Sequence, residues 1–308
     1  MKPTSDLGRV ARRASVFLLT IFLAAPAGAQ ERQRANLDDP IPILRRGEPG
    51  ETRRYQVTRV NRALSATGAV MLVSRADGIL DRVLEKEVAP GQWTERFTWK
   101  EYRFGSGAVG ATSVEPSIFP AATGFSYQVD PRTTDLESHS QPVVGMPPGE
   151  SASLFAVLRL DTWGFEAGMS ELRKLGRATL QIGEDIELGV SPGADRIGAE
   201  AGELEGTYKL GSHSLQVVGL TKCGDGETCL RLAFSAEGNA VKQDTPMVSL
   251  DGHEYFSGSV EFSVEDGRLV EGDLWGPLVA TFTQSGAALP IAGVMQEVRI
   301  REVALPGN

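Results

Sequence analysis

Residues 214–235 read SLQVVGLTKCGDGETCLRLAFS and contain both cysteines of the chain. Two apolar runs, residues 215–220 and 230–234, flank a short segment with two glycines and one aspartate. These residue types suit the positive φ angles of a tight connection between antiparallel strands. The stretch therefore predicts a β-hairpin that is closed by a disulfide between Cys223 and Cys229.

The register expected for this hairpin supports the disulfide. If Cys223 lies opposite Cys229, strand pleating places on one face Val218, Leu220, Leu230, Leu232 and Phe234. A bridge across so short a loop stabilises the protein by about 2–3 kcal/mol on the loop-entropy model. A redox or metal pair is the weaker alternative, because five residues separate the two cysteines and two thiolates do not complete a zinc site.

The N-terminus has the order of a cleavable secretory signal peptide. Four basic residues precede an apolar run at residues 14–25, and small residues follow up to Ala29. The apolar run is about half of the roughly 20 residues that span a bilayer, and no later run is longer. We therefore expect a signal peptide at residues 1–29, no membrane span, and a mature protein in the periplasm or outside the cell.

Composition narrows the range of partners. The 308 residues carry a formal net charge of −9, and removal of residues 1–29 takes away four basic residues and one acidic residue, which leaves −12. Because nucleic acids and anionic lipid surfaces repel an acidic protein, neither is expected as the main partner. The 41% apolar content and the length suit one large or two medium domains.

The N-terminal half contains strand-like runs. Residues 30–50 are polar and rich in proline, which predicts an extended leader or linker. Residues 51–150 predict a β-rich lobe that ends in an irregular segment rich in proline and glycine. Its strands are expected to be separated by turns at Gly68, Asp77-Gly78 and Pro90-Gly91.

The C-terminal half follows the same pattern. Residues 151–177 repeat apolar positions at spacings of three and four, which predicts one or two short helices. Residues 178–308 predict a second β-rich lobe that holds the Cys223–Cys229 hairpin. Within it, Asp251-Gly252 and Glu265-Asp266-Gly267 are expected to form turns.

The fold class is therefore mainly β, either all-β or α+β. We expect antiparallel meanders that form curved half-barrels or a sandwich, with the short helices between the two lobes. The two lobes share a pattern of strands and Asp-Gly pairs that leaves a duplication open, although any antiparallel meander requires such a pattern.

One local enrichment suggests a binding site in a chain that is only 7% aromatic. The run at residues 93–104 places several rings close together, and the candidate ligand-binding residues are Trp93, Phe97, Trp99 and Tyr102. A change in apolar parity along this run predicts a bulge near Lys100-Glu101. The rings could line an apolar cavity or stack on sugars; the alternative is a strand of the hydrophobic core.

Signatures of catalysis are missing from the sequence. The three histidines do not occur in metal-binding spacings, and nucleophile elbows and phosphate-binding loops are lacking. His213 and His253 could meet with a nearby carboxylate to hold a divalent metal; the alternative is that both are surface residues beside turns. We expect no catalytic residue, no metal and no cofactor.

These observations favour an exported, non-enzymatic envelope protein. We expect it to bind an apolar small molecule or an envelope protein on a curved β-sheet. The alternatives are an exported hydrolase with carboxylate catalysis or a glycan-binding module, because the many Asp and Glu residues permit a carboxylate pair whose separation the sequence does not show.

Overall fold

The chain is described by a computed structural model. The residues whose structure it describes are 40–107, 110–111, 113–129, 172, 177–188, 195–196, 205–209, 211–224, 226–244 and 248–305. The expected signal peptide lies outside these ranges. So does the expected helical segment at 151–177, except for Leu172 and Arg177.

Antiparallel strands dominate the described residues, which confirms a mainly β fold. The long strands are β2 (Thr52–Leu64), β3 (Val70–Ala89), β4 (Gln92–Gly107), β11 (Ser212–Cys223), β12 (Glu227–Asp244), β13 (Ser249–Ser263), β14 (Leu269–Gln284) and β16 (Gly293–Val303). The short ones are β1 (Ile41–Pro42), β5 (Ser117–Ile118), β6 (Ser126–Val129), β7 (Thr179–Leu180), β8 (Asp185–Leu188), β9 (Asp195–Arg196), β10 (Glu205–Lys209) and β15 (Ala287–Ala288). A 3₁₀ turn, η1, spans Pro120–Ala122.

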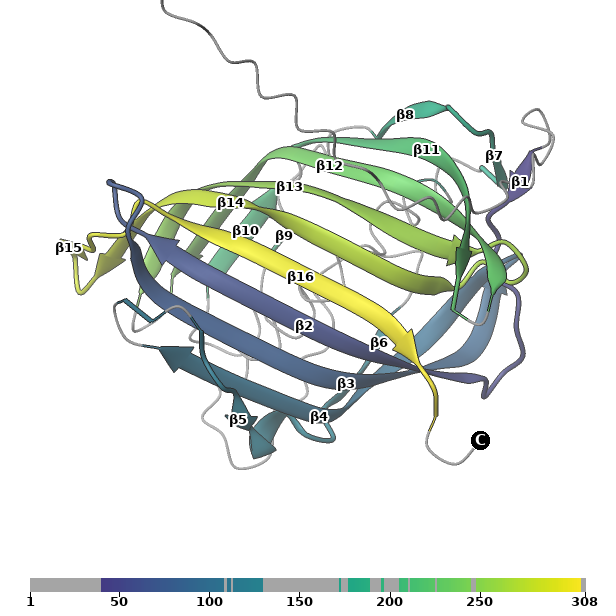
Figure 1. Ribbon diagram of the computed structural model, residues 1–308, viewed down its shortest axis with the longest axis horizontal. Coiled ribbons are helices and arrows are strands. Elements are labelled where there is room, and N and C mark those ends of the chain that lie inside the picture. Colours follow the sequence, from purple (N-terminus) through teal and green to yellow (C-terminus); the bar gives the residue numbers. More distant parts are fainter. Residues whose placement is uncertain are drawn as a thin grey trace, which may run out of the picture. The chain divides into compact units, whose positions relative to one another are not determined.

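One large sheet contains all of these strands except β1 and β7, which pair with each other. Its main order is β5-β4-β3-β2-β16-β14-β13-β12-β10-β9, and β11 pairs with β12 on the same side as β10 (Figure 1). The first and last long strands are neighbours, because β2 pairs with β16 from Arg54 opposite Val303 to Leu64 opposite Gly293. The strand-rich segments of the two halves therefore share one continuous sheet.

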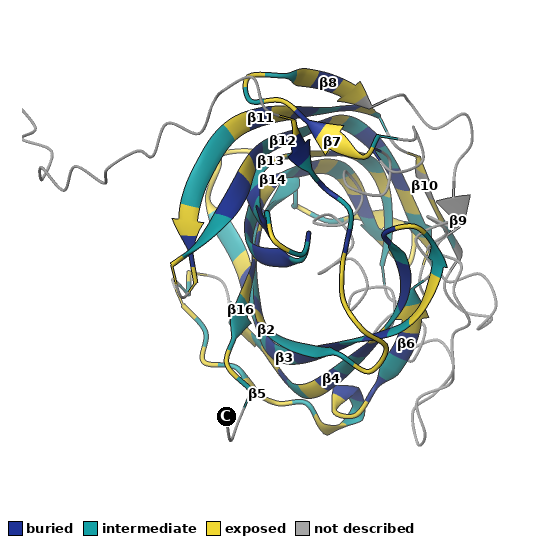
Figure 2. Ribbon diagram, turned by 90° about the vertical axis from the view of Figure 1, so that its right-hand side faces the viewer, coloured by how far each residue is buried: buried dark blue, intermediate teal, exposed yellow. Residues whose placement is uncertain are grey.

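The sheet is strongly curved around an apolar interior. Seen from its end, the strands follow one another around a common inside, and buried positions alternate with more exposed ones (Figure 2). The alternation follows from strand pleating: Tyr55 and Val57 on β2, and Leu230 and Leu232 on β12, all point into one core. Leu172 also belongs to this core and is fully buried.

The hairpin at residues 212–244 confirms the prediction, with one correction of register. Cys223 and Cys229 form a disulfide, with Cα atoms 5.9 Å apart. Cys223 lies opposite Glu227, so the two cysteines are diagonal neighbours rather than direct partners. The pairing also shifts between Val217 and Gly219.

This shift changes which side chain faces inward. Gly219 has a φ of 152°, which is open to glycine but strained for other residues. The bulge therefore turns Val217 into the core and leaves Val218 exposed by 51%. The expectation that Val218 shares the apolar face is wrong, whereas Leu230, Leu232 and Phe234 are buried as expected.

The expected turns divide into two groups. Gly68, Gly91 and Gly267 lie between strands with positive φ angles, which confirms three of the turns. Asp77-Gly78 and Asp251-Gly252 instead lie inside strands β3 and β13, so the turns expected there are wrong.

The two mid-strand glycines do not reverse the chain; they allow a neighbouring group to lie close to the backbone. A Cβ atom at Gly78 would lie 2.4 Å from Cζ3 of Trp99, and one at Gly252 would lie 2.2 Å from the carbonyl oxygen of Val279. Glycine is therefore needed at both positions because a neighbouring group occupies the space of a side chain.

Candidate ligand-binding site

The four predicted aromatic residues lie on the inner side of β4. Trp93, Phe97, Trp99 and Tyr102 are each exposed by 8% or less. Trp99 and Tyr102 face the same way although they are three residues apart, because Leu80 pairs with Trp99 and Ile79 with Glu101, which leaves Lys100 as an extra residue. This confirms the predicted bulge.

A second set of rings from the chain around β6 completes the aromatic group. Phe97 stacks on Tyr127 with ring centroids 5.3 Å apart, and the rings of Trp99 and Tyr102 are nearly perpendicular with centroids 5.4 Å apart. Phe125 lies 6.1 Å from Tyr127, and its carbonyl oxygen accepts a 2.9 Å hydrogen bond from the backbone N–H of Trp99. We call Phe97, Trp99, Tyr102, Phe125 and Tyr127 the aromatic group.

The indole of Trp99 has an unusual environment. Its side chain is fully buried, and its Nε1 has no hydrogen-bond partner among the described residues. Buried polar atoms nearly always have a partner, because leaving one unpaired costs roughly 1–3 kcal/mol. The indole N–H is thus a hydrogen-bond donor in an apolar interior, and an acceptor atom placed beside it would satisfy this donor.

An extended segment crosses one end of the sheet next to these rings. We call residues 43–50 the strap; it is the last part of the expected leader. The backbone N–H of Ile43 donates to Ala178 (3.1 Å), that of Arg46 to Asp266 (2.8 Å), and that of Gly50 to Leu84 (2.7 Å). The strap therefore connects the β7 region, the β13–β14 hairpin and β3.

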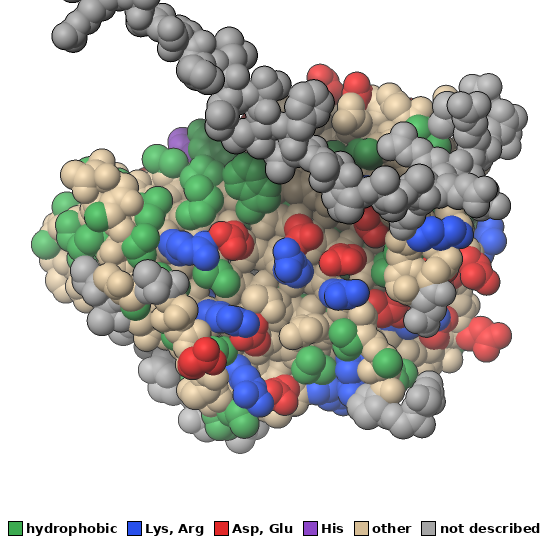
Figure 3. Space-filling view, viewed as in Figure 1, with side chains coloured by type: hydrophobic (Ala, Val, Ile, Leu, Met, Phe, Trp, Pro, Cys, Tyr) green, Lys and Arg blue, Asp and Glu red, His purple; other side chains and the backbone are tan. Residues whose placement is uncertain are grey.

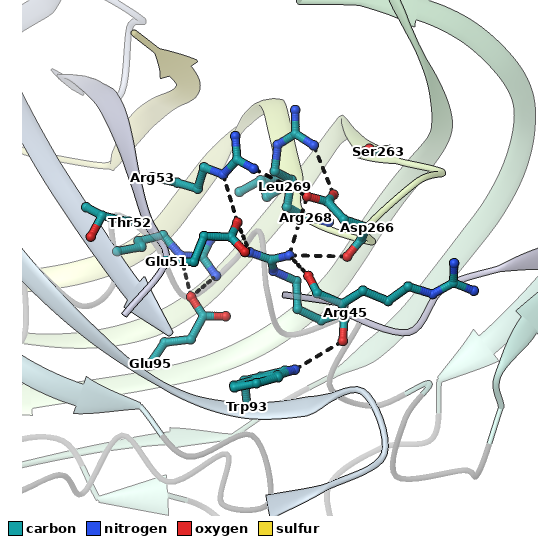
Figure 4. Close-up of polar contacts among 12 residues, drawn as sticks. Arg45, Glu51, Thr52, Arg53, Trp93, Glu95, Ser263, Asp266, Arg268 and Leu269 are labelled. Carbon is teal, nitrogen blue, oxygen red and sulfur yellow. Dashed lines mark hydrogen bonds and ion pairs between the residues drawn. The ribbon is translucent and has the colours of Figure 1, made fainter. Parts of the chain in front are cut away.

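Arg45 holds the middle of the strap (Figure 4). Its side chain is only 7% exposed and forms ion pairs with Glu51 at 3.0 Å and with Asp266 at 3.5 Å. Its carbonyl oxygen accepts a hydrogen bond from the indole Nε1 of Trp93 at 3.2 Å. Trp93 thus contacts the strap and is separate from the aromatic group.

Further ion pairs surround Arg45. Arg53 pairs with Glu51 at 2.9 Å and with Glu302 at 3.3 Å. Arg268 pairs with Glu302 at 2.9 Å, with Asp266 at 3.0 Å and with Glu227. Together these residues tie the strap to the start of β2, to the end of β16 and to the β11–β12 and β13–β14 hairpins.

The ion-pair network shifts the pKa values of Glu51 and Arg268. Burial alone would raise the pKa of its carboxyl group, but the hydrogen bonds and charges of Arg53 and Arg45 outweigh burial and lower it below the ordinary value. Burial likewise opposes the charge of Arg268, and the carboxylates of Asp266 and Glu302 raise its pKa nevertheless. Both groups are therefore charged at neutral pH.

Arg82 links the ion pairs to the aromatic group. Its guanidinium carbon lies 4.8 Å from the ring centroid of Phe97 and 5.3 Å from that of Tyr55, which is a cation–π arrangement. Its Nε donates to Glu95 at 2.9 Å. Arg82 is 8% exposed, and its charge lies inside the sheet against these rings and the carboxylate of Glu95.

A small recess lies among these charges. It is lined by apolar side chains, by Glu95 and by four arginines, which are Arg45, Arg53, Arg82 and Arg268. Its volume of about 10 Å³ is enough for one water molecule. Each arginine already pairs with a carboxylate, so this network serves mainly to fasten the strap.

The two histidines considered for a metal site lie on different faces of the sheet. His213 is 3% exposed and its Nε2 lies 2.8 Å from Oδ1 of the buried Asn239, so it is not the surface residue that was expected. His253 lies on the exposed face of β13. The metal site considered for this pair does not form, and the described residues contain no other cluster of three potential metal ligands.

Comparisons with known proteins identify no family. No family model matches the chain, and no curated protein matches it. Solved structures with partial similarity include DynF of the dynemicin biosynthesis pathway of Micromonospora chersina, with 8% identity, a TM-score of 0.25, and coverage of 86% of this chain and 84% of that chain. A protein of Bacteroides fragilis, described as exported and as having a YmcC-like fold, shows 10% identity, a TM-score of 0.22, and coverage of 85% and 100%.

These TM-scores are too low to support an inference about function. Within the described part of the chain, no helix is long and apolar enough to cross a membrane.

Proposed function

We propose that this chain is an exported, non-catalytic protein that binds an apolar ligand inside its curved sheet. The observation that carries the proposal is the buried Trp99 indole, whose Nε1 lacks an acceptor among the described residues. The ligand class is an apolar molecule with one carbonyl, carboxyl or ester oxygen. That oxygen accepts the indole hydrogen bond, and the rest of the molecule contacts the rings.

The aromatic group provides the apolar part of such a site. Aromatic side chains bury roughly 150–250 Å² each and account for much of the binding energy at ligand sites. Here the rings of Phe97 and Tyr127 stack, and Trp99 and Tyr102 meet edge to face, so the rings form a preorganised surface. In the Trp99–Tyr102 pair, the polar groups are the indole N–H of Trp99 and the hydroxyl of Tyr102.

The strap is the element that a ligand would displace on its way to the interior. It crosses the end of the sheet beside Trp93, which lies on β4 as Phe97 and Trp99 do. Its fastening combines the buried side chain of Ile43 with polar contacts through Arg45 and Asp266. Displacing the strap therefore means exposing Ile43 and hydrating the ion pairs of Arg45.

Binding of a sugar polymer is less well supported. Stacking on a polysaccharide needs exposed rings, whereas the four candidate residues Trp93, Phe97, Trp99 and Tyr102 are exposed by 8% or less. The carboxylates of the ion-pair network are each engaged by an arginine, so the network presents no carboxylate pair for hydrolysis. The apolar ligand is therefore the proposal that the site supports best.

Native mass spectrometry of protein purified from its own host, followed by solvent extraction, tests the proposal. We expect one apolar molecule per chain, and Trp99→Phe should retain the fold but lose most of the bound molecule because the indole donor is gone. Trp275→Phe is the matched control, since Trp275 is 54% exposed on the outer face. A bare protein mass that stays unchanged after incubation with fatty acids and their esters would overturn the proposal.

A further inference from the structure

The outer face of the sheet carries an apolar patch over β13, β14 and β16. Tyr255 is exposed by 40%, and Trp275 and Val279 by 54% each. Pairing places Val279 opposite His253 and Pro277 opposite Met295, and the pairs on either side set Tyr255 beside Pro277. We call Tyr255, Trp275, Pro277, Val279 and Met295 the outer patch.

The strand pattern shows that this patch is not an extension of the core. Leu274 and Leu278 of β14 point inward and are exposed by 4% and 9%. The residues between and beside them, Trp275 and Val279, must then face outward. A sheet with one packed face usually presents polar residues on the other. Large apolar side chains grouped on the outward face therefore indicate an interaction surface.

The charges beside the outer patch are balanced. Arg62 on β2 pairs with Glu297 on β16, and Arg299 on β16 pairs with Asp273 on β14. Figure 3 shows basic and acidic side chains interspersed along this face, next to a group of hydrophobic side chains. These two ion pairs carry no net charge, whereas the whole chain carries a net charge of −9.

We propose that the outer patch is the contact surface of a homodimer, with a second copy of this chain as its occupant. Two acidic molecules repel each other least where their surfaces are locally neutral. A surface that carries both signs can also complement itself when a two-fold axis turns it over, so that each base faces an acid of the other copy. The exposed rings of Trp275 and Tyr255 then become buried anchors, which are the residue types that dominate protein interfaces.

Sedimentation velocity over a range of protein concentrations tests the dimer. We expect the mass of two chains at micromolar concentration, and Trp275→Glu should raise the dimer dissociation constant by roughly 30-fold or more, as expected for loss of a central aromatic anchor. Ile118→Glu is the matched control, because Ile118 is also exposed, by 58%, but lies on β5. The control should leave the dimer intact.

Exchanging the charges of Arg62 and Glu297 tests whether this ion pair lies at the contact between the two copies. Glu297→Arg alone should weaken the dimer, and adding Arg62→Glu should restore it because the four flanking positions again carry two acids and two bases. A chain that sediments as a monomer at all concentrations would overturn the proposal. A dimer that survives Trp275→Glu would also overturn it, because the contact would then lie elsewhere. Neither result affects ligand extraction, which depends on the inner face.

Discussion

The indole Nε1 of Trp93 donates a 3.2 Å hydrogen bond to the carbonyl oxygen of Arg45. This contact joins β4, which carries the aromatic group, to the strap that crosses the end of the sheet. The same arginine reaches Asp266 with its side chain, 221 residues away in sequence. A residue of the leader therefore connects the β3–β4 hairpin to the β13–β14 hairpin.

Removing the charge of Arg45 should destabilise the protein. Arg45→Met keeps much of the side-chain volume but leaves Glu51 and Asp266 with fewer cationic partners in a largely buried network. We expect a loss of about 3 kcal/mol in the free energy of unfolding, measured by urea denaturation. Arg103→Met is the control, because the Arg103–Glu101 pair is half exposed and should contribute less than about 1 kcal/mol. Equal losses for the two variants would contradict a special role of the strap.

Gly78 and Trp99 should be energetically coupled. In Gly78→Ala the new methyl group would overlap the Trp99 ring, and overpacking of this kind costs roughly 1–3 kcal/mol. Trp99→Phe removes the ring atoms that clash. The double variant should therefore lose less stability than the sum of the two single changes. Strict additivity in chemical denaturation would show that Trp99 does not lie over Gly78.

The disulfide should contribute modestly to stability. Replacing Cys223 and Cys229 with serine opens a loop of only a few residues, and we expect the free energy of unfolding to fall by about 2 kcal/mol. The wild-type protein treated with a reducing agent should lose the same amount. If reduction has no effect, the two thiols are already free, and an Ellman titration of the native protein would detect them.

Local signals in the sequence were sufficient for the hairpin, the aromatic strand and the bulge at Lys100. Each depends on residues close together in the chain. The ion-pair network was not predicted, because Arg45, Asp266 and Glu302 meet only after β2 pairs with β16 and the sheet curves. One signal was present in the leader: Ile41, Ile43 and Arg45 alternate, and all three are buried. Gly78 and Gly252 were misread as turn residues because a glycine needed for close approach has the same sequence signature.

Glu51 should make stability depend on pH in a defined direction. Its pKa is lowered in the folded protein from an ordinary value of 4.5, so the folded state favours the charged form. This contribution is present above the unfolded pKa and is lost as the pH falls through the folded pKa. The difference in unfolding free energy between wild type and Glu51→Gln should thus be largest near pH 7 and should shrink below about pH 4.5. A difference that is constant from pH 7 to pH 3 would contradict the pairing with Arg45 and Arg53.

Glu261 should behave in the opposite way. Burial raises the pKa of its carboxyl group, and the charges of Glu271 and Asp273 raise it further, while Arg231 lowers it. The folded state therefore favours the protonated form, and the contribution of Glu261 to stability decreases as the pH rises from the ordinary value of 4.5 through the folded pKa.

Glu261→Gln should consequently stabilise the protein at pH 7, with a gain that disappears at pH 4, in thermal unfolding measured across this range. Glu297→Gln is the control, since Glu297 is half exposed on the same outer face and pairs with Arg62, so that its loss should not stabilise the protein. If Glu261→Gln destabilises the protein at pH 7, the attraction of Arg231 outweighs burial and the two neighbouring carboxylates. The charged residues Arg231, Glu261, Glu271 and Asp273 would then stabilise the folded protein together, and the repulsion among the three acids would be the smaller effect.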